Sequence, residues 1–81
     1  MDEVFTYRLN MDYQGIRDVF TLGGVSSVPA TLAIKDIAIA MNHTIPHVIK
    51  SITDINIRAN QQDMPMPFIW SVSGAYVTLN V

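Results

Sequence analysis

The stretch IKDIAIAMNHTIPHVIKSITDI, residues 34–55, determines the fold that we expect for this chain of 81 residues. Its first part places apolar side chains at the i, i+3, i+4 and i+7 spacing of one helical face. These side chains are Ile34, Ile37, Ala38 and Met41. Asn42 can adopt the left-handed backbone conformation that ends a helix, and Thr44 is a good N-cap for a second helix. The stretch therefore predicts two short helices joined by a tight turn, which is the outline of a helix-turn-helix.

The second helix of this pair has an apolar face and a polar face. Pro46 is tolerated in its first turn, where the backbone N–H has no partner within the helix. The apolar face consists of residues at helical spacing, which are Ile45, Val48, Ile49, Ile52 and Ile55. The outer face carries the polar residues His47, Lys50, Ser51 and Asp54. In a DNA-binding helix-turn-helix, this second helix is the one that enters the major groove.

The segment before this stretch predicts a further helix. Apolar residues at positions 9, 13, 16 and 20 have helical spacing, although Gly15 weakens the pattern by about 1 kcal/mol. Residues 4–9 either belong to this helix or form a short strand. The glycine pair at 23–24 ends the first element, and residues 31–33 predict a brief strand.

After residue 55 the apolar pattern changes from a helical period to a period of two. Residues 55–59 alternate apolar and polar, as a half-buried strand does. Residues 60–67 contain two prolines and predict a loop. Two further strands are expected at 68–72 and 76–81, joined by a tight turn at Ser73-Gly74.

This order of elements predicts an α+β fold with one domain, residues 1–81. The architecture that fits it is a small winged helix-turn-helix, with three helices and a two- to three-stranded antiparallel wing sheet. The wing itself is expected at residues 60–67, between strands that begin near Ile55 and Phe68.

Composition narrows the class of protein. The chain is 49% hydrophobic, which is ample for a core, and only 15% charged. A surface short of charge favours self-association or contact with another protein. Because cysteine is absent, a disulfide framework, a cysteine-based zinc site and a thiol nucleophile are excluded. No apolar run approaches the ~20 residues that span a bilayer, and the N-terminus lacks the pattern of a signal peptide. We therefore expect a cytoplasmic protein without membrane contact.

Double-stranded DNA is one expected partner. The candidate DNA contacts come from the helix-turn-helix and the segment after it, and they are Lys35, Thr44, His47, Lys50, Ser51 and Arg58. Lys50 and Ser51 can reach base edges or phosphates, and Thr44 can bond a phosphate at a helix N-terminus. The charge balance works against this prediction, because the chain has five basic residues, seven acidic residues and a net charge of −2.

The C-terminal part favours a second copy or another protein as the partner. No Lys or Arg occurs in residues 59–81, whereas a wing that enters the minor groove of DNA usually carries a cation. The loop offers Met64 and Met66 instead, and methionine is common on adaptable protein-binding surfaces. Tyr76 and Thr78 share one face of the last strand, which can pair with its copy in a dimer if it lies at a sheet edge.

Two histidines are the remaining candidates for chemistry. His43 and His47 are four residues apart and can meet on one helical face. A metal site needs a third and usually a fourth ligand, and only Asp63 offers itself, so we expect two surface histidines and no metal. No phosphate-binding loop or catalytic carboxylate pair is visible. We therefore predict no enzymatic activity, no cofactor and no small-molecule substrate.

Two segments resemble a known family. Ile37-Ala38, Met41 and Val48-Ile49 stand where winged helix-turn-helix proteins place small and apolar residues. More narrowly, residues 30–52, ATLAIKDIAIAMNHTIPHVIKSI, and residues 64–79, MPMPFIWSVSGAYVTL, resemble the Rha family of phage regulatory proteins. The resemblance covers about half of the chain and implies a phage or prophage regulator with a DNA-binding winged helix.

These observations lead to two functional predictions. The first is a small, non-enzymatic transcription regulator of phage type that binds DNA as a dimer or with a partner. The alternative is a protein–protein interaction module, such as a virus-encoded inhibitor of a host protein, that uses the apolar Met-Pro loop and the charge-poor strands.

Overall fold

The computed structural model describes residues 12–21 and 30–80, which form three helices and a three-stranded antiparallel sheet. The elements are a first helix at residues 12–21, β1 (Ala30–Ala33), α2 (Ile34–Met41), α3 (Ile45–Gln61), β2 (Phe68–Trp70) and β3 (Tyr76–Leu79). The protein is a small α+β domain with the predicted layout of a winged helix-turn-helix. The predictions for residues 4–9 and 23–29 lie outside the described residues.

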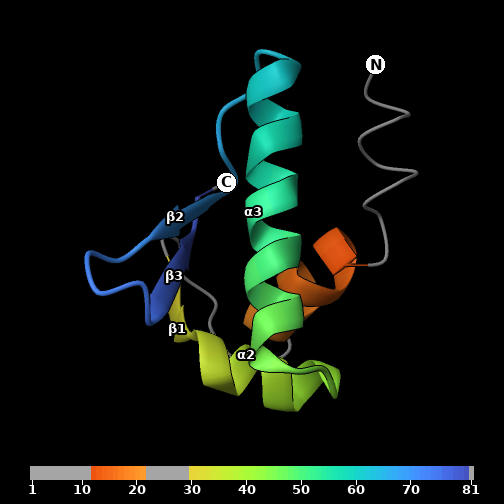
Figure 1. Ribbon diagram of the computed structural model, residues 1–81, viewed down its shortest axis with the longest axis vertical. Coiled ribbons are helices and arrows are strands. Elements are labelled where there is room, and N and C mark those ends of the chain that lie inside the picture. Colours follow the sequence, from red (N-terminus) through yellow and green to blue (C-terminus); the bar gives the residue numbers. More distant parts are fainter. Residues whose placement is uncertain (1–11, 22–29, 81) are drawn as a thin grey trace.

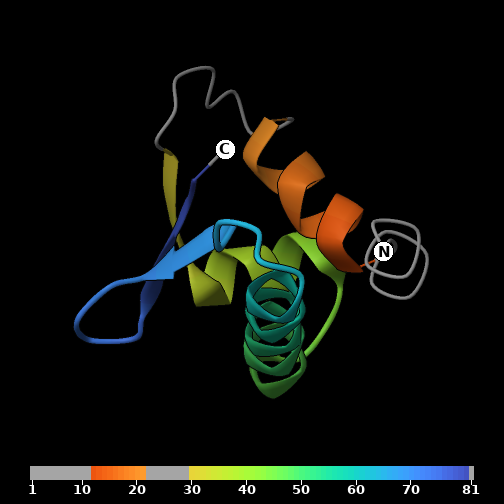
Figure 2. The ribbon, with the colours of Figure 1, turned by 90° about the horizontal axis from the view of Figure 1, so that it is seen from above.

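The long helix α3 stands at the centre of the domain (Figure 1). The sheet lies along one side of α3 and the first helix on another, while α2 crosses near its N-terminal end. The view from above shows α3 end-on, with the β2–β3 hairpin and the first helix projecting in different directions from it (Figure 2). Both the sheet and the first helix are therefore positioned by α3.

The turn between α2 and α3 has the geometry that its sequence predicts. Asn42 adopts φ 58° and ψ 42°, in the left-handed region. Its N–H donates to the carbonyl of Ile39 at 3.1 Å, and the N–H of His43 donates to the carbonyl of Ala38 at 2.9 Å. These two bonds form a Schellman motif, which satisfies carbonyls that the end of the helix leaves free. The predicted helix-turn-helix is confirmed.

The helix α3 begins after Thr44, whose hydroxyl accepts a hydrogen bond from the N–H of His47 at 3.2 Å. It continues to Gln61, so the strand predicted at residues 55–59 is wrong. The buried side of α3 explains the difference, because its apolar residues keep helical spacing through that segment. These buried residues are Val48, Ile52, Ile55 and Ala59.

The C-terminal end of α3 repeats the motif that ends α2. Asp63 has a φ of 57°, again in the left-handed region. Its N–H donates to the carbonyl of Asn60 at 3.1 Å, and the N–H of Met64 donates to the carbonyl of Ala59 at 2.8 Å. Pro65 follows, and proline cannot continue a helix. The loop predicted before β2 is therefore present, but it is shorter than residues 60–67 because α3 includes residues 60 and 61.

The wing of the domain is the β2–β3 hairpin and not the loop that precedes it. The connection at residues 71–75 contains the predicted turn at Ser73-Gly74, and Gly74 has a φ of 75°, which favours glycine. The N–H of Ser71 donates to the carbonyl of Tyr76 at 2.9 Å and closes the hairpin. The wing was expected at residues 60–67 because the sequence pattern ended the helix near residue 55, and the wing can begin only after α3 ends.

The strand order β1-β3-β2 makes β3 the central strand. Both of its edges are paired, so the edge-to-edge dimer considered for this strand is not available to β3. The predicted faces of β3 are confirmed, because Val77 and Leu79 are buried while Tyr76 is exposed and Thr78 half-buried on the other face. On that outer face the hydroxyls of Thr31 and Thr78 lie 2.8 Å apart and bridge β1 to β3.

The core joins all the elements. Its buried hydrophobic residues are Ile16, Phe20, Ile34, Ile37, Ala38, Val48, Ile52, Ile55, Ala59, Phe68, Val77 and Leu79. Two members of the predicted apolar face do not belong to it, because Ile45 is 46% exposed and Ile49 is 40% exposed. Both lie toward one edge of the buried stripe of α3, on a side that no other described element covers completely.

Phe68 is the residue at which the first helix, α3 and the sheet meet. Its ring contacts Tyr13 edge-on at a centroid distance of 6.0 Å and Phe20 at 6.4 Å. Its backbone is held by the buried side chain of Asn56, whose amide donates to the Phe68 carbonyl at 2.8 Å and accepts from the Phe68 N–H at 3.3 Å. β2 is an edge strand of the described sheet, so no neighbouring strand of that sheet bonds the outward-facing backbone groups of Phe68. The side chain of Asn56 bonds these groups instead.

Ala38→Leu should destabilise the domain by about 1–3 kcal/mol through overpacking. Ala38 is only 3% exposed and lies in the core where α2 packs on α3. Denaturant unfolding measures the effect, with Ala40→Leu as the control, because Ala40 lies on the exposed side of the same helix. Equal stabilities for the two variants would contradict the packing of α2 described above.

Asn56→Ala should lower the free energy of unfolding by about 2 kcal/mol, because it leaves two buried backbone groups of Phe68 without partners. Asn60→Ala is the matched control, since Asn60 is exposed one turn further along α3. Amide exchange at β2 should also increase in the Asn56 variant. A loss of stability that spares the exchange of β2 would place the role of Asn56 elsewhere.

Candidate functional site

The side of α3 that faces the wing is apolar and partly open to solvent. Ile45, Ile49 and Ile57 are 46%, 40% and 50% exposed. Steps of four and eight residues place all three along one side of the helix, which also carries Thr53. Three large aliphatic side chains on one exposed side of a helix are unusual for a surface with no partner.

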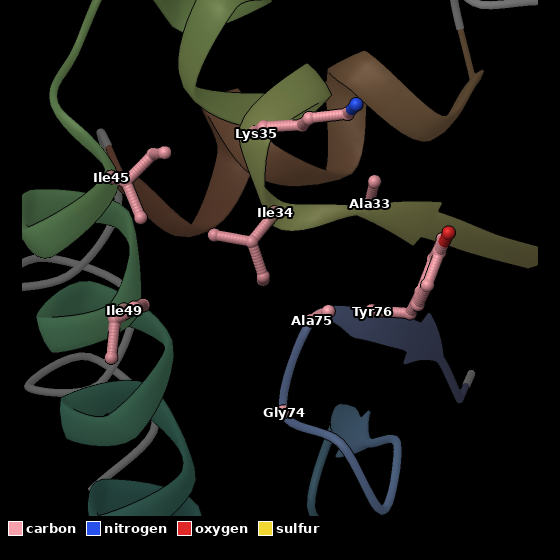
Figure 3. A pocket seen from close by; sticks show the side chains of 8 residues that line it. All are labelled: Ala33, Ile34, Lys35, Ile45, Ile49, Gly74, Ala75 and Tyr76. Carbon is pink, nitrogen blue, oxygen red and sulfur yellow. The ribbon is translucent and has the colours of Figure 1, made fainter.

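The N-terminal half of this side borders a pocket of about 350 Å³ between α3, α2 and the wing. We call it the Lys35 pocket, and its lining residues are Ala33, Ile34, Lys35, Ile45, Ile49, Gly74, Ala75 and Tyr76. Ile45 and Ile49 form one wall, and Gly74, Ala75 and Tyr76 form the opposite wall (Figure 3). Among the described residues that line it, Lys35 is the single charged one.

The C-terminal half of the same side borders a second pocket of about 590 Å³, which we call the Trp70 pocket. Its lining residues are Thr53, Asn56, Ile57, Asn60, Gln61, Met66 and Trp70. Trp70 is half-buried and packs against the core, so it joins this pocket to the interior of the domain. The two pockets follow one another along α3 and both lie between that helix and the wing.

The candidate interface residues are divided between these pockets and other places. Met66 is 47% exposed and lines the Trp70 pocket, and Tyr76 is 50% exposed and lines the Lys35 pocket. Met64 is 37% exposed but lines neither of the two. Thr78 is occupied by its contact with Thr31.

The three cationic DNA candidates do not form one patch. Lys35 lines the pocket from the start of α2, and no ion pair joins it to another described residue. Lys50 is exposed but pairs with Asp54 of the next turn at 3.0 Å. Arg58 is nine residues after Ile49, and two and a half turns put it on the opposite side of α3.

The three remaining DNA candidates are held by contacts within the protein. Ser51 was expected on the outer face of α3, but it is only 7% exposed, and its hydroxyl donates to Asp12 Oδ2 of the first helix at 2.6 Å. His47 Nε2 lies 3.5 Å from the same carboxylate. The hydroxyl of Thr44 is used by the N-cap. Ser51 and His47, on the polar side of α3, therefore bind the first helix through Asp12.

His43 joins this polar cluster from the turn before α3. Its ring stacks on the ring of His47 with centroids 4.2 Å apart. One ligand atom each from Asp12, His43 and His47 lie within 4.8 Å of one another. Asp63, the single further ligand that the sequence analysis considered, lies beyond the other end of α3. Asp12 was missed because no local pattern connects it to residues 31 and 35 positions away.

Comparison with protein-family models, curated proteins and solved structures finds no significant match to this chain. Within the described residues, no helix combines the length and the apolar character needed to cross a membrane.

Ser51→Ala should destabilise the domain by about 1–3 kcal/mol, because it removes a hydrogen bond to a charged group. The loss should appear first as faster amide exchange in residues 12–21, which Ser51 holds through Asp12. Thr53→Ala is the control, since the hydroxyl of Thr53 donates to the carbonyl of Ile49 in its own helix and, within residues 12–21 and 30–80, to no other group. Unchanged exchange of the first helix in the Ser51 variant would contradict this role.

Proposed function

We propose that the protein is a non-enzymatic regulator that acts by binding an apolar segment of another protein between α3 and the wing. The observation that carries the proposal is the line of exposed isoleucines on the wing side of α3, with a pocket at each half of the helix. In a winged helix this is the side that would meet DNA, and here it offers phosphates little charge.

The composition of the two pockets supports a protein ligand. Their walls provide isoleucine, methionine, tryptophan and tyrosine side chains, which are types that bury large apolar areas at protein interfaces. Burying one exposed isoleucine contributes about 1.5–3 kcal/mol at most, so three partly exposed ones supply a substantial driving force. Thr53, Asn60 and Gln61 also line the Trp70 pocket, and their polar groups can bond the backbone of a ligand.

Charge indicates what kind of segment fits. Lys35 stands at the edge of an otherwise uncharged pocket, and no described acid neutralises it. The ligand that complements this surface is an apolar segment with a carboxylate near the position of Lys35. A helix with two apolar side chains about two to three turns apart matches the spacing of the pockets along α3.

Duplex DNA is the second candidate, and the helix-turn-helix layout is the specific observation that favours it. Lys50 is exposed on α3 and can contact phosphate once it leaves Asp54. The wing turn, residues 71–75, carries no Lys or Arg, and neither does any residue from 59 to 81. DNA binding through this surface would therefore be weak for each domain and would rely on a dimer or partner.

The phage origin implied by the Rha resemblance, a cytoplasmic location and dimerisation complete the proposal as sequence-based predictions. A second copy of the chain is itself a protein ligand, so dimerisation and partner binding can use the same apolar side of α3.

Selection of peptides from a random display library against the domain tests the protein-binding function. We expect peptides with paired apolar residues and an acidic residue, whose affinity falls at least about tenfold, or about 1.4 kcal/mol, in Ile49→Ser and in Ile57→Ser. Ile39→Ser is the control, because Ile39 is 77% exposed on α2 and lines neither pocket. Lys35→Gln should remove the preference for acidic peptides and leave the apolar preference.

Two results would reject this function. One is a set of selected peptides that bind Ile49→Ser and Ile39→Ser equally well. The other is salt-dependent binding of duplex DNA that weakens in Lys50→Ala and Arg58→Ala but not in Ile49→Ser, which would assign the function to DNA. A mass measurement in solution over a range of concentrations shows whether a second copy occupies the surface.

A further inference from the structure

The N-terminal end of α3 brings together two imidazoles and a carboxylate from three separate segments. Asp12 belongs to the first helix, His43 to the turn after α2, and His47 to the first turn of α3. His47 Nε2 is 3.5 Å from both carboxylate oxygens of Asp12, and the three potential ligand atoms lie within 4.8 Å of one another. The cluster is distinct from the apolar side of α3, because Ser51 and His47 face the first helix.

We propose that Asp12, His43 and His47 bind one divalent ion of the zinc class, with water in the fourth position. Imidazole nitrogen and carboxylate oxygen are ordinary ligands of Zn²⁺, with bonds of about 2.0–2.2 Å. A tetrahedral ion with such bonds separates its ligand atoms by about 3.3 Å. The contact of 3.5 Å between His47 and Asp12 already has nearly this span. Only His43, which is exposed in the turn, has to turn its ring inward.

The backbone and a neighbouring hydroxyl hold the ligands in place. The N–H of His43 donates to the carbonyl of Ala38, and the N–H of His47 donates to the N-cap oxygen of Thr44. The hydroxyl of Ser51 donates to Asp12 Oδ2 at 2.6 Å and leaves Oδ1 able to face the ion. A hydrogen bond to the ligand side chain itself, as from Ser51 to Asp12, orients a metal ligand and raises affinity. Ser51 therefore acts as a positioning residue in this site.

The chemistry of the cluster selects among ions. Two nitrogen ligands and one oxygen suit Zn²⁺, Co²⁺ or Ni²⁺, whereas Mg²⁺ prefers oxygen ligands and retains its water. Because the ligands come from three segments, the ion would join the first helix to the helix-turn-helix. Metal binding would thus stabilise the docking of residues 12–21, in addition to the hydrogen bond between Asp12 and Ser51.

Titration of the metal-free chain, without any histidine tag, tests the proposal. We expect one Zn²⁺ per chain by calorimetry and a visible absorption spectrum typical of tetrahedral Co²⁺ that Zn²⁺ abolishes. Mg²⁺ should not compete. Asp12→Asn, His43→Gln and His47→Gln should each lower the affinity for Zn²⁺ at least about tenfold. Zn²⁺ should also slow amide exchange in residues 12–21 of the parent chain.

The control is Asp18→Asn, which changes a carboxylate on the same helix whose side chain accepts from Gln14 and not from the cluster. His43→Gln alters an exposed side chain, and a thermal melt without metal verifies that the variant folds. Absence of saturable Zn²⁺ binding would overturn the proposal. Binding that survives in His43→Gln, or that Asp12→Asn leaves unchanged, would also overturn it, because the ion would then be held by other groups.

Discussion

The packing of Phe68 is the interaction on which the rest of the structure depends. Its side chain is fully buried, and its ring touches Tyr13 and Phe20 of the first helix. Its backbone is bonded to Asn56 of α3 and belongs to β2 of the sheet. One residue therefore contacts the first helix, α3 and the sheet at the same point. The orientation of the wing relative to α3, and hence the shape of both pockets, follows from this junction.

The fixed angle between wing and α3 gives the central helix two sides with different chemistry. The side toward the wing presents isoleucines and is nearly free of charge, while the side toward the first helix carries Ser51, His47 and the Asp12 carboxylate. Separation of this kind matters because apolar contact and metal ligation need different surroundings. A ligand in the pockets and an ion in the cluster would not compete for the same atoms, but both would act on the placement of α3.

The helix-turn-helix could be predicted because the residues that define it act on backbone groups only a few positions away in the chain. Asn42 and Thr44 act through their own backbone neighbours, so their roles could be read from the chain and are confirmed. Residues 55–59 fit both a helical and an alternating pattern. The packing of the core decides in favour of the helix, because Ile55 and Ala59 are buried on the same side of α3 as Val48. The predicted position of the wing was wrong for the same reason, since the wing can begin only after α3 ends.

The candidate site could be predicted only in part, for the same physical reason. Lys35, Met66 and Tyr76 were singled out by type, but their division between two pockets depends on tertiary packing. Ser51 was assigned to the wrong face because it lies at the edge of the buried stripe. At that edge, a rotation of α3 about its own axis by a few tens of degrees decides whether a side chain is buried or exposed. The contact of Asp12 with His47 and Ser51 spans 35 and 39 residues, beyond the reach of any local pattern.

The pairing of β1 with the central strand has a consequence for the order of folding. The contacts of α2 with α3, and of β2 with β3, join neighbours in the chain and can form quickly. The pairing of Thr31 with Thr78 instead closes a loop of 47 residues that contains the whole helix-turn-helix and the hairpin. Closing such a loop is entropically unfavourable until its interior is compact. We expect β1 to be added last, so the unpaired side of β3 is exposed to other chains for as long as that step takes.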